Sequence, residues 1–168
     1  MKRALLLVAF ASSVVRADTL DGVYELAKVN DKVTADLLRA PDTVWARYLL
    51  SYAEGKVTAR IQVVNKTKEA DKFVTCDAAV TLPITWKGSS YTIAEEVAAE
   101  GTFVSLVKTK EGDRPKLSTE KKNCTVFLKK GTYKAQKTKD GAKLTTEAGD
   151  VFTLAPAEAE PKYLDILK

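Results

Sequence analysis

The chain contains no histidine, and this absence excludes several large classes of enzyme. Without an imidazole there is no Ser-His-Asp or Cys-His triad, no HExxH zinc site and no histidine general base. The sequence also lacks a GxSxG elbow, a Walker loop, a GxGxxG fingerprint and any Cys or His spacing suited to a metal. We therefore predict a protein that is not an enzyme, with no cofactor and no metal site.

Glycine, proline and cysteine are scarce as well, with 8 Gly, 5 Pro and 2 Cys in 168 residues. This scarcity excludes a collagen-like repeat, and we find no low-complexity tract and no domain linker. The 45% of hydrophobic residues is typical of a folded globular chain. A domain usually has roughly 150 residues, so we expect one domain, residues 18–168.

Long hydrophobic runs are absent except close to the N-terminus. There, Lys2 and Arg3 precede an apolar run, Ala4 to Ala11, and small or modest side chains follow at Val15 and Ala17. The run is too short to span a bilayer, which takes about 20 residues. We predict a signal peptide, residues 1–17, cut after Ala17, and a secreted or periplasmic mature protein.

Cys76 and Cys124 are the two cysteines, and in an exported protein such a pair is more often a disulfide than two free thiols. Each lies in a stretch where apolar and polar residues alternate, which points both sulfurs toward the core. We predict a Cys76–Cys124 disulfide that stabilises the fold by roughly 4 kcal/mol in the chain-entropy model. A redox-active pair is the alternative, but there is no CxxC spacing.

Alternation of apolar and polar residues recurs along most of the chain and predicts an antiparallel meander. Turns are expected at Glu54-Gly55 and Asp140-Gly141, among others. Helix is expected only at 34–40, with Thr34 as N-cap and Pro41 as terminator, and weakly at 94–100. The apolar C-terminal tail is expected to dock on the body. The expected strands are 23–29, 44–52, 57–64, 73–82 with a possible extension to 86, 91–93, 102–108, 123–129, 132–137, 142–146 and 151–154.

So many short strands must bury their inward faces on each other, and closing the sheet removes exposed edges. The fold class is therefore predicted to be all-β, an antiparallel meander closed into a barrel with one short helix. A two-sheet β-sandwich satisfies the same alternation and is the alternative.

The chain resembles the lipocalin-like (calycin) barrels in its signal peptide, in Gly22-Val23-Tyr24 at the first strand, in the lid-like segment 34–40 and in the closing meander 131–157. Tyr24 stands where that family usually has Trp. The resemblance implies a barrel in which Tyr24 plugs the closed end and a small apolar molecule is carried inside.

Alternation directs a set of side chains inward, and these are the candidate ligand-binding residues. Either they fill the interior as core, or they line a cavity for a small apolar or amphipathic ligand. Buried tyrosine hydroxyls need partners, which the polar end of a ligand can provide. The set consists of Tyr48, Leu50, Tyr52, Ile61, Val63 and Tyr133.

The opposite face of the same strand carries Trp45, Arg47, Leu49 and Ser51. Arg47 is expected either to stack on the Trp45 indole or to remain a solvated neighbour of it.

Basic residues concentrate in the segment 108–143, where twelve Lys and Arg accompany four Asp and Glu. Such a region either keeps the protein soluble or attracts an anionic polymer or membrane surface. Lysine outnumbers arginine and few aromatics intervene, so we expect no sequence-specific nucleic-acid binding. The chain is expected to be a monomer. The candidate anion-binding residues are Lys121, Lys122, Lys129, Lys130 and Lys134.

Overall fold

The computed structural model describes residues 19–38, 40–68, 72–107, 118–120 and 125–158. Nearly all of this chain is antiparallel β-structure, as the alternation predicts. The elements are β1 (Gly22–Val29), β2 (Lys32–Val33), α1 (Thr34–Leu37), β3 (Thr43–Ala53), β4 (Lys56–Lys66), β5 (Lys72–Pro83), β6 (Thr85–Lys87), β7 (Ser90–Ile93), β8 (Val97–Glu100), β9 (Thr102–Val107), β10 (Ser118–Glu120), β11 (Thr125–Leu128), β12 (Gly131–Thr138), β13 (Gly141–Thr146) and β14 (Val151–Pro156).

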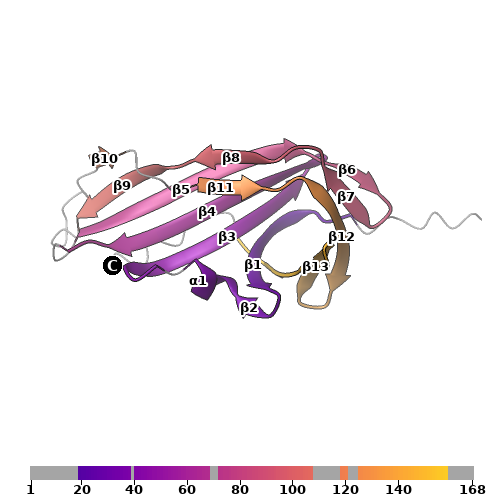
Figure 1. Ribbon diagram of the computed structural model, residues 1–168, viewed down its shortest axis with the longest axis horizontal. Coiled ribbons are helices and arrows are strands. Elements are labelled where there is room, and N and C mark those ends of the chain that lie inside the picture. The colour runs from indigo at the N-terminus through magenta and orange to yellow at the C-terminus, as the bar shows by residue number, and fades with distance from the viewer. Residues whose placement is uncertain (1–18, 39, 69–71, 108–117, 121–124, 159–168) are drawn as a thin grey trace, which may run out of the picture.

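One curled sheet makes up most of the molecule, and it forms a half-barrel. Its strand order is β10-β9-β5-β4-β3-β1-β14-β13-β12-β7-β6, with β2 paired to β1. The three long strands β3, β4 and β5 lie side by side, and β1, β12 and β13 curl below their right-hand ends (Figure 1).

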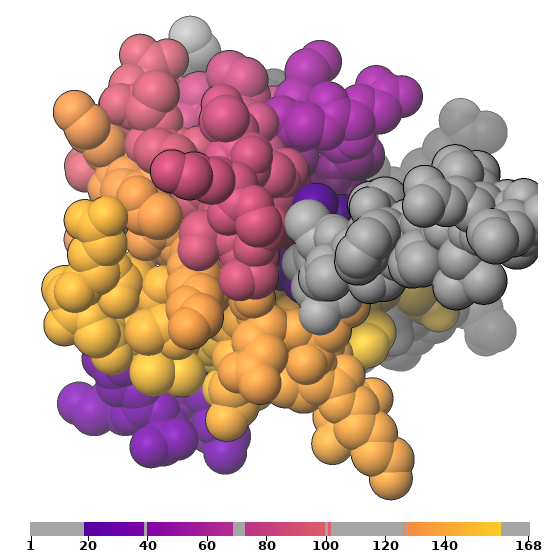
Figure 2. Space-filling model, turned by 90° about the vertical axis from the view of Figure 1, so that its right-hand side faces the viewer, coloured from indigo at the N-terminus to yellow at the C-terminus, as the bar shows by residue number. Residues whose placement is uncertain are grey.

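The sheet turns back on itself where β5 passes into β6. Between these strands the amide of Ile84 donates a hydrogen bond to the carbonyl of Gly55 at 2.8 Å, which holds the bend against the β3–β4 turn. Beyond the bend, β6 pairs with β7 and β7 pairs with β12. These strands and β12–β14 lie together at this end of the molecule, which faces the viewer in Figure 2. The bend therefore closes one end, and the long strands stay paired with one another as they extend to the other.

A second, two-stranded sheet of β8 and β11 packs on the inner side of β4 and β5. Small residues permit the close approach: Ala59 and Ala78 are buried, and a Cβ at Gly101 would lie 2.7 Å from the Cβ of Ala78. The expectation of a helix at 94–100 is wrong, because residues 97–100 form β8. A segment of about two turns has little helical stability of its own, and pairing with β11 prevails over its composition.

The one helix of the described chain is shorter than expected. It spans Thr34–Leu37, Val33 is its N-cap, and no side chain caps it. Thr34 was therefore the wrong N-cap; it lies inside the first turn and is buried. No helix in the described part of the chain has the length and apolar character needed to cross a membrane.

Two of the predicted turns are confirmed. Glu54 and Gly55 both have positive φ, 50° and 70°, the geometry of a tight hairpin turn. At the β12–β13 turn, Gly141 has φ 140° and lies against the backbone of Leu154, so no Cβ fits there.

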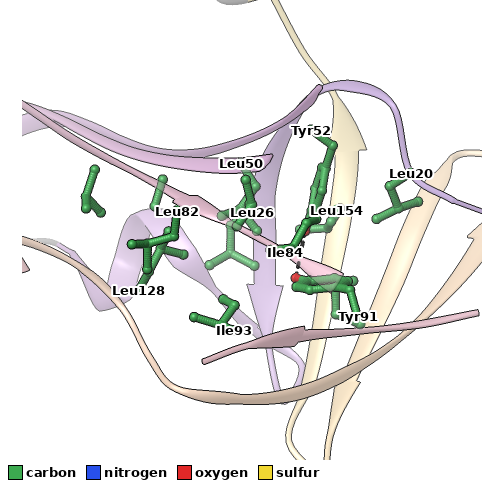
Figure 3. Packing of buried hydrophobic residues seen from close by; sticks show 14 of the residues in the cluster. Leu20, Leu26, Leu50, Tyr52, Leu82, Ile84, Tyr91, Ile93, Leu128 and Leu154 are labelled. Atoms are coloured by element: carbon green, nitrogen blue, oxygen red, sulfur yellow. Dashed lines mark hydrogen bonds between the residues drawn. The ribbon is translucent and has the colours of Figure 1, made fainter. Parts of the chain in front are cut away.

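The core lies on the inner face of the sheet, where Leu26, Leu50, Leu82, Leu128 and Leu154 are buried together (Figure 3). Their inward direction follows from the period of two that the sequence displays. Cys76 is buried in the same cluster, as predicted. Cys124 lies outside the described residues, so the disulfide stays a prediction.

Candidate functional site

The candidate ligand-binding residues come from three strands, and all contribute to the inner face. Tyr48, Leu50 and Tyr52 lie on β3, and Ile61 and Val63 follow on β4, with Tyr48 directly opposite Ile61 in the register. Leu50 and Tyr52 are buried in the core, whereas Tyr48, Ile61, Val63 and, on β12, Tyr133 are partly buried and pack against it. The inward direction of all six is confirmed, and ligand binding remains a prediction.

An aromatic cluster fills the closed end. The Tyr52 and Tyr91 hydroxyls form a hydrogen bond of 2.9 Å, drawn as a dashed line in Figure 3. Tyr91 also stacks on Tyr133, with ring centroids 5.2 Å apart, and meets Trp86 edge-on at 5.0 Å. Tyr52 and Tyr91 are therefore core filling, one of the two alternatives that the sequence left open, whereas Tyr133 keeps some exposure at the edge of the cluster.

Tyr24 lies at the same end, partly buried. Its ring meets that of Tyr52 edge-on at 6.0 Å, and its hydroxyl donates to the carbonyl of Asp21 at 3.0 Å. It therefore adds to the cluster from β1, the strand on which the resemblance placed it.

Next to the fully buried part of the cluster, the inner face is less covered on β3, β4 and β12. We call Tyr48, Ile61, Val63 and Tyr133 the inner strip, because all four face inward and retain some exposure. Burial raises the pKa of Tyr48, and the neighbouring Tyr133 raises it further. Tyr133 donates its hydroxyl to the carbonyl of Lys129 at 3.0 Å, so one end of the strip lies beside exposed lysines. The strip offers apolar surface with a polar margin.

A hollow of about 270 Å³ lies at the β3–β4 turn. Tyr52 is the one candidate ligand residue that borders it. The sequence reasoning missed Leu20, Ile84 and Trp86, which supply its apolar wall. The only signal for them was the extension of the fifth strand toward Trp86; nothing marked Leu20, just past the expected cleavage site. The lining residues are Thr19, Leu20, Asp21, Tyr52, Ala53, Glu54, Gly55, Lys56, Ile84 and Trp86.

The lysine-rich region is described only in part. Lys121 and Lys122 lie outside the described residues, and Lys129 and Lys130 are exposed just before β12. Lys134 pairs with Thr145 on β13 and Ser90 on β7, and its neighbour Ala135 is buried, so Lys134 faces outward. Lys143 faces the same way, because it pairs with Gln136 and its neighbours Ala142 and Leu144 are buried.

No three Asp, Glu, Cys or His side chains gather at metal-binding distance in the described ranges. No family model, no curated protein and no solved structure matches this chain.

Proposed function

We propose that this chain is an exported binding protein that holds a small apolar or amphipathic molecule against the inner strip. The supporting observation is that Tyr48, Ile61 and Val63 face the concave side of the sheet and remain partly exposed beside a filled core. Apolar surface in a concavity is where small ligands gain most from leaving water. The packed aromatic cluster gives such a ligand a rigid surface to pack against.

An amphipathic molecule fits this surface better than a purely apolar one. The Tyr133 hydroxyl bonds to the carbonyl of Lys129, and Lys129 and Lys130 are exposed, so these groups can meet a polar or anionic head. The hydrocarbon part then covers Ile61 and Val63. The lipocalin-like resemblance supports the same class of ligand, although a fold alone does not determine a function.

The experiment is a fluorescence titration of the mature protein with anilinonaphthalene sulfonate, an amphipathic probe. Ile61→Asn places an amide in the strip and Ile61→Trp fills it, so both changes are expected to weaken binding by roughly tenfold, about 1.4 kcal/mol. The matched control is Val33→Asn, at a valine that is 45% exposed on β2, away from the strip. Unchanged affinity in both Ile61 variants contradicts the proposal, and native mass spectrometry of the isolated protein tests for a retained ligand.

A second function is favoured by the outward direction of Lys134 and Lys143 on adjacent strands. Together with Lys129 and Lys130 they offer a basic face to an anionic polymer or membrane surface. This function predicts retention on heparin that weakens steeply with salt, because at 0.1 M ionic strength exposed charges more than about 10 Å apart are already largely screened. Replacing Lys129, Lys130 and Lys134 by Gln is expected to abolish retention, while Gln at Lys28, Lys56 and Lys66 should not. Equal loss in both sets indicates only general charge attraction.

Export and the disulfide belong to the same proposal. Removal of residues 1–17 would leave Asp18 as the first residue, which N-terminal sequencing of the secreted protein tests. Thr125, the residue after Cys124 in the sequence, pairs with Glu100 on β8. A Cβ at Gly101 would lie 2.8 Å from Cys76 Sγ, so Cys76 lies close to the residue that follows Glu100. Non-reducing peptide mapping is expected to recover the two cysteines linked.

A further inference from the structure

The outer face of the three long strands carries a buried band, although outer faces of single sheets normally meet water. Leu49 on β3 is 2% exposed, and Gln62 and Val64 on β4 are each 0% exposed. Leu49 points away from the core residue Leu50, and Gln62 and Val64 alternate with the inward Ile61 and Val63. Something covers this face.

The band has a polar centre that runs across the strands. Arg47, Gln62 and Asp77 lie opposite one another on β3, β4 and β5. Arg47 Nε donates to Gln62 Oε1 at 2.7 Å, and Gln62 Nε2 donates to Asp77 Oδ2 at 3.1 Å. Asp77 also forms an ion pair with Arg60.

Arg47 is a buried cation on this face. It is 3% exposed, and its guanidinium lies 5.5 Å from the centre of the Trp45 ring. The predicted stacking on Trp45 is therefore confirmed, and the alternative of a solvated pair is wrong. Burial lowers the pKa of the guanidinium.

The main contacts of β4 within the described chain do not explain this cover. They are with β3 and β5 in the same sheet and with β11, whose Val126 and Leu128 belong to the inner core. Glu158, the last described residue, indicates which segment covers the band. Its carbonyl oxygen accepts a hydrogen bond of 3.4 Å from Arg47 Nη1. The preceding Ala157 is fixed by a bond of 2.9 Å from its amide to the carbonyl of Val23. The chain therefore reaches the buried band as it leaves β14.

We propose that residues 159–168 lie across the outer face of β3, β4 and β5 and cover this band. The segment contains Tyr163, Leu164, Ile166 and Leu167, apolar side chains suited to Trp45, Leu49 and Val64. Ten extended residues span about 33 Å, whereas neighbouring strands lie about 4.8 Å apart, so the tail can cross all three. The chain's own C-terminus thus occupies a surface that would otherwise be an exposed apolar patch.

Tryptophan emission tests this placement. The chain has two tryptophans, so Trp86→Phe leaves Trp45 as the sole reporter on the outer face. In that background, a chain ending at Glu158 is expected to emit at longer wavelength and to be quenched severalfold more strongly by acrylamide. Leu164→Asp with Ile166→Asp should do the same in the full-length chain, so the test stands even where the shortened chain does not fold. The matched control, Lys162→Gln with Lys168→Gln, should leave both readings unchanged.

Four results overturn the proposal, three of them from the variants and one from a peptide. One is an unchanged Trp45 signal in the double aspartate variant. Another is a Trp45 emission that shifts when residues 1–17 are removed but not when residues 159–168 are removed, because residues 1–17 would then be the cover. The third is a signal in the full-length chain that changes on dilution, which would make a second copy the cover. A synthetic peptide of residues 159–168 is expected to bind the shortened chain and restore the emission, and failure to do so in a folded shortened chain also contradicts the placement.

Discussion

The hydroxyls of Tyr52 on β3 and Tyr91 on β7 lie 2.9 Å apart inside the closed end of the half-barrel, and both side chains are almost fully buried. These strands are not neighbours in the sheet, so the hydrogen bond joins opposite walls across the interior. The pair satisfies two polar groups that would otherwise be costly to bury.

Removing one hydroxyl of this pair should destabilise the fold. Tyr91→Phe leaves the Tyr52 hydroxyl buried without its partner, and we expect a loss of about 1–3 kcal/mol in the free energy of unfolding. The double variant Tyr52→Phe with Tyr91→Phe should cost less than the sum of the single changes, because neither hydroxyl is then left unpaired. Urea unfolding curves measure all three, and simple additivity would contradict the pairing.

Stability should fall at alkaline pH. Burial raises the pKa of Tyr48, Tyr52 and Tyr91 above the ordinary value of about 10. The folded chain then holds protons that the unfolded chain releases, so this stability is complete below about pH 10 and declines as the pH rises further. Thermal melts between pH 8 and pH 12 follow the decline, and Tyr52→Phe with Tyr91→Phe should flatten it. A decline of the same steepness in that variant would place its cause elsewhere.

Asn30 should stabilise the fold by joining two turns. Its side-chain amide donates to Asp150 Oδ1, and its side-chain oxygen accepts from the Val151 amide, both at 2.8 Å. The backbone of Asn30 also has φ 48°, a left-handed conformation that residues with a Cβ rarely adopt. Asn30→Gly removes the hydrogen bonds but permits this φ, so we expect a loss of about 1–2 kcal/mol. Asn30→Ala should lose more, and equal losses would show that the backbone is not under constraint.

Gly101 should tolerate no side chain. A Cβ there would lie 2.7 Å from Ala78 Cβ, 2.8 Å from Cys76 Sγ and 2.9 Å from the Asp77 carbonyl oxygen. Gly101→Ala is therefore expected to cost about 1–3 kcal/mol through overpacking. The control is Gly88→Ala: unlike Gly101, Gly88 has positive φ, but a Cβ there would meet nothing within 4 Å, so its cost is conformational alone. A thermal shift for Gly101→Ala no larger than that for Gly88→Ala would contradict the close packing.

Much of the candidate site was predictable because side-chain direction in a strand is a local property. Alternation was enough to turn Tyr48, Leu50 and Tyr52 inward and Trp45 and Arg47 outward. Alternation did not predict that Tyr91 would bury Tyr52 while Tyr48 stays partly exposed. This difference depends on β7, a strand about forty residues away in the sequence.

The sequence by itself determined the strands, their inward faces and the tight turns at Glu54-Gly55 and Asp140-Gly141, because each depends on neighbouring residues. Only the tertiary structure decided that the sheet bends between Pro83 and Thr85 into a half-barrel and that residues 97–100 form a strand instead of a helix. It also decided that Arg47 is buried on an outer face. These outcomes depend on contacts between distant segments, whose free energies outweigh local propensity and leave no mark in a window of neighbouring residues.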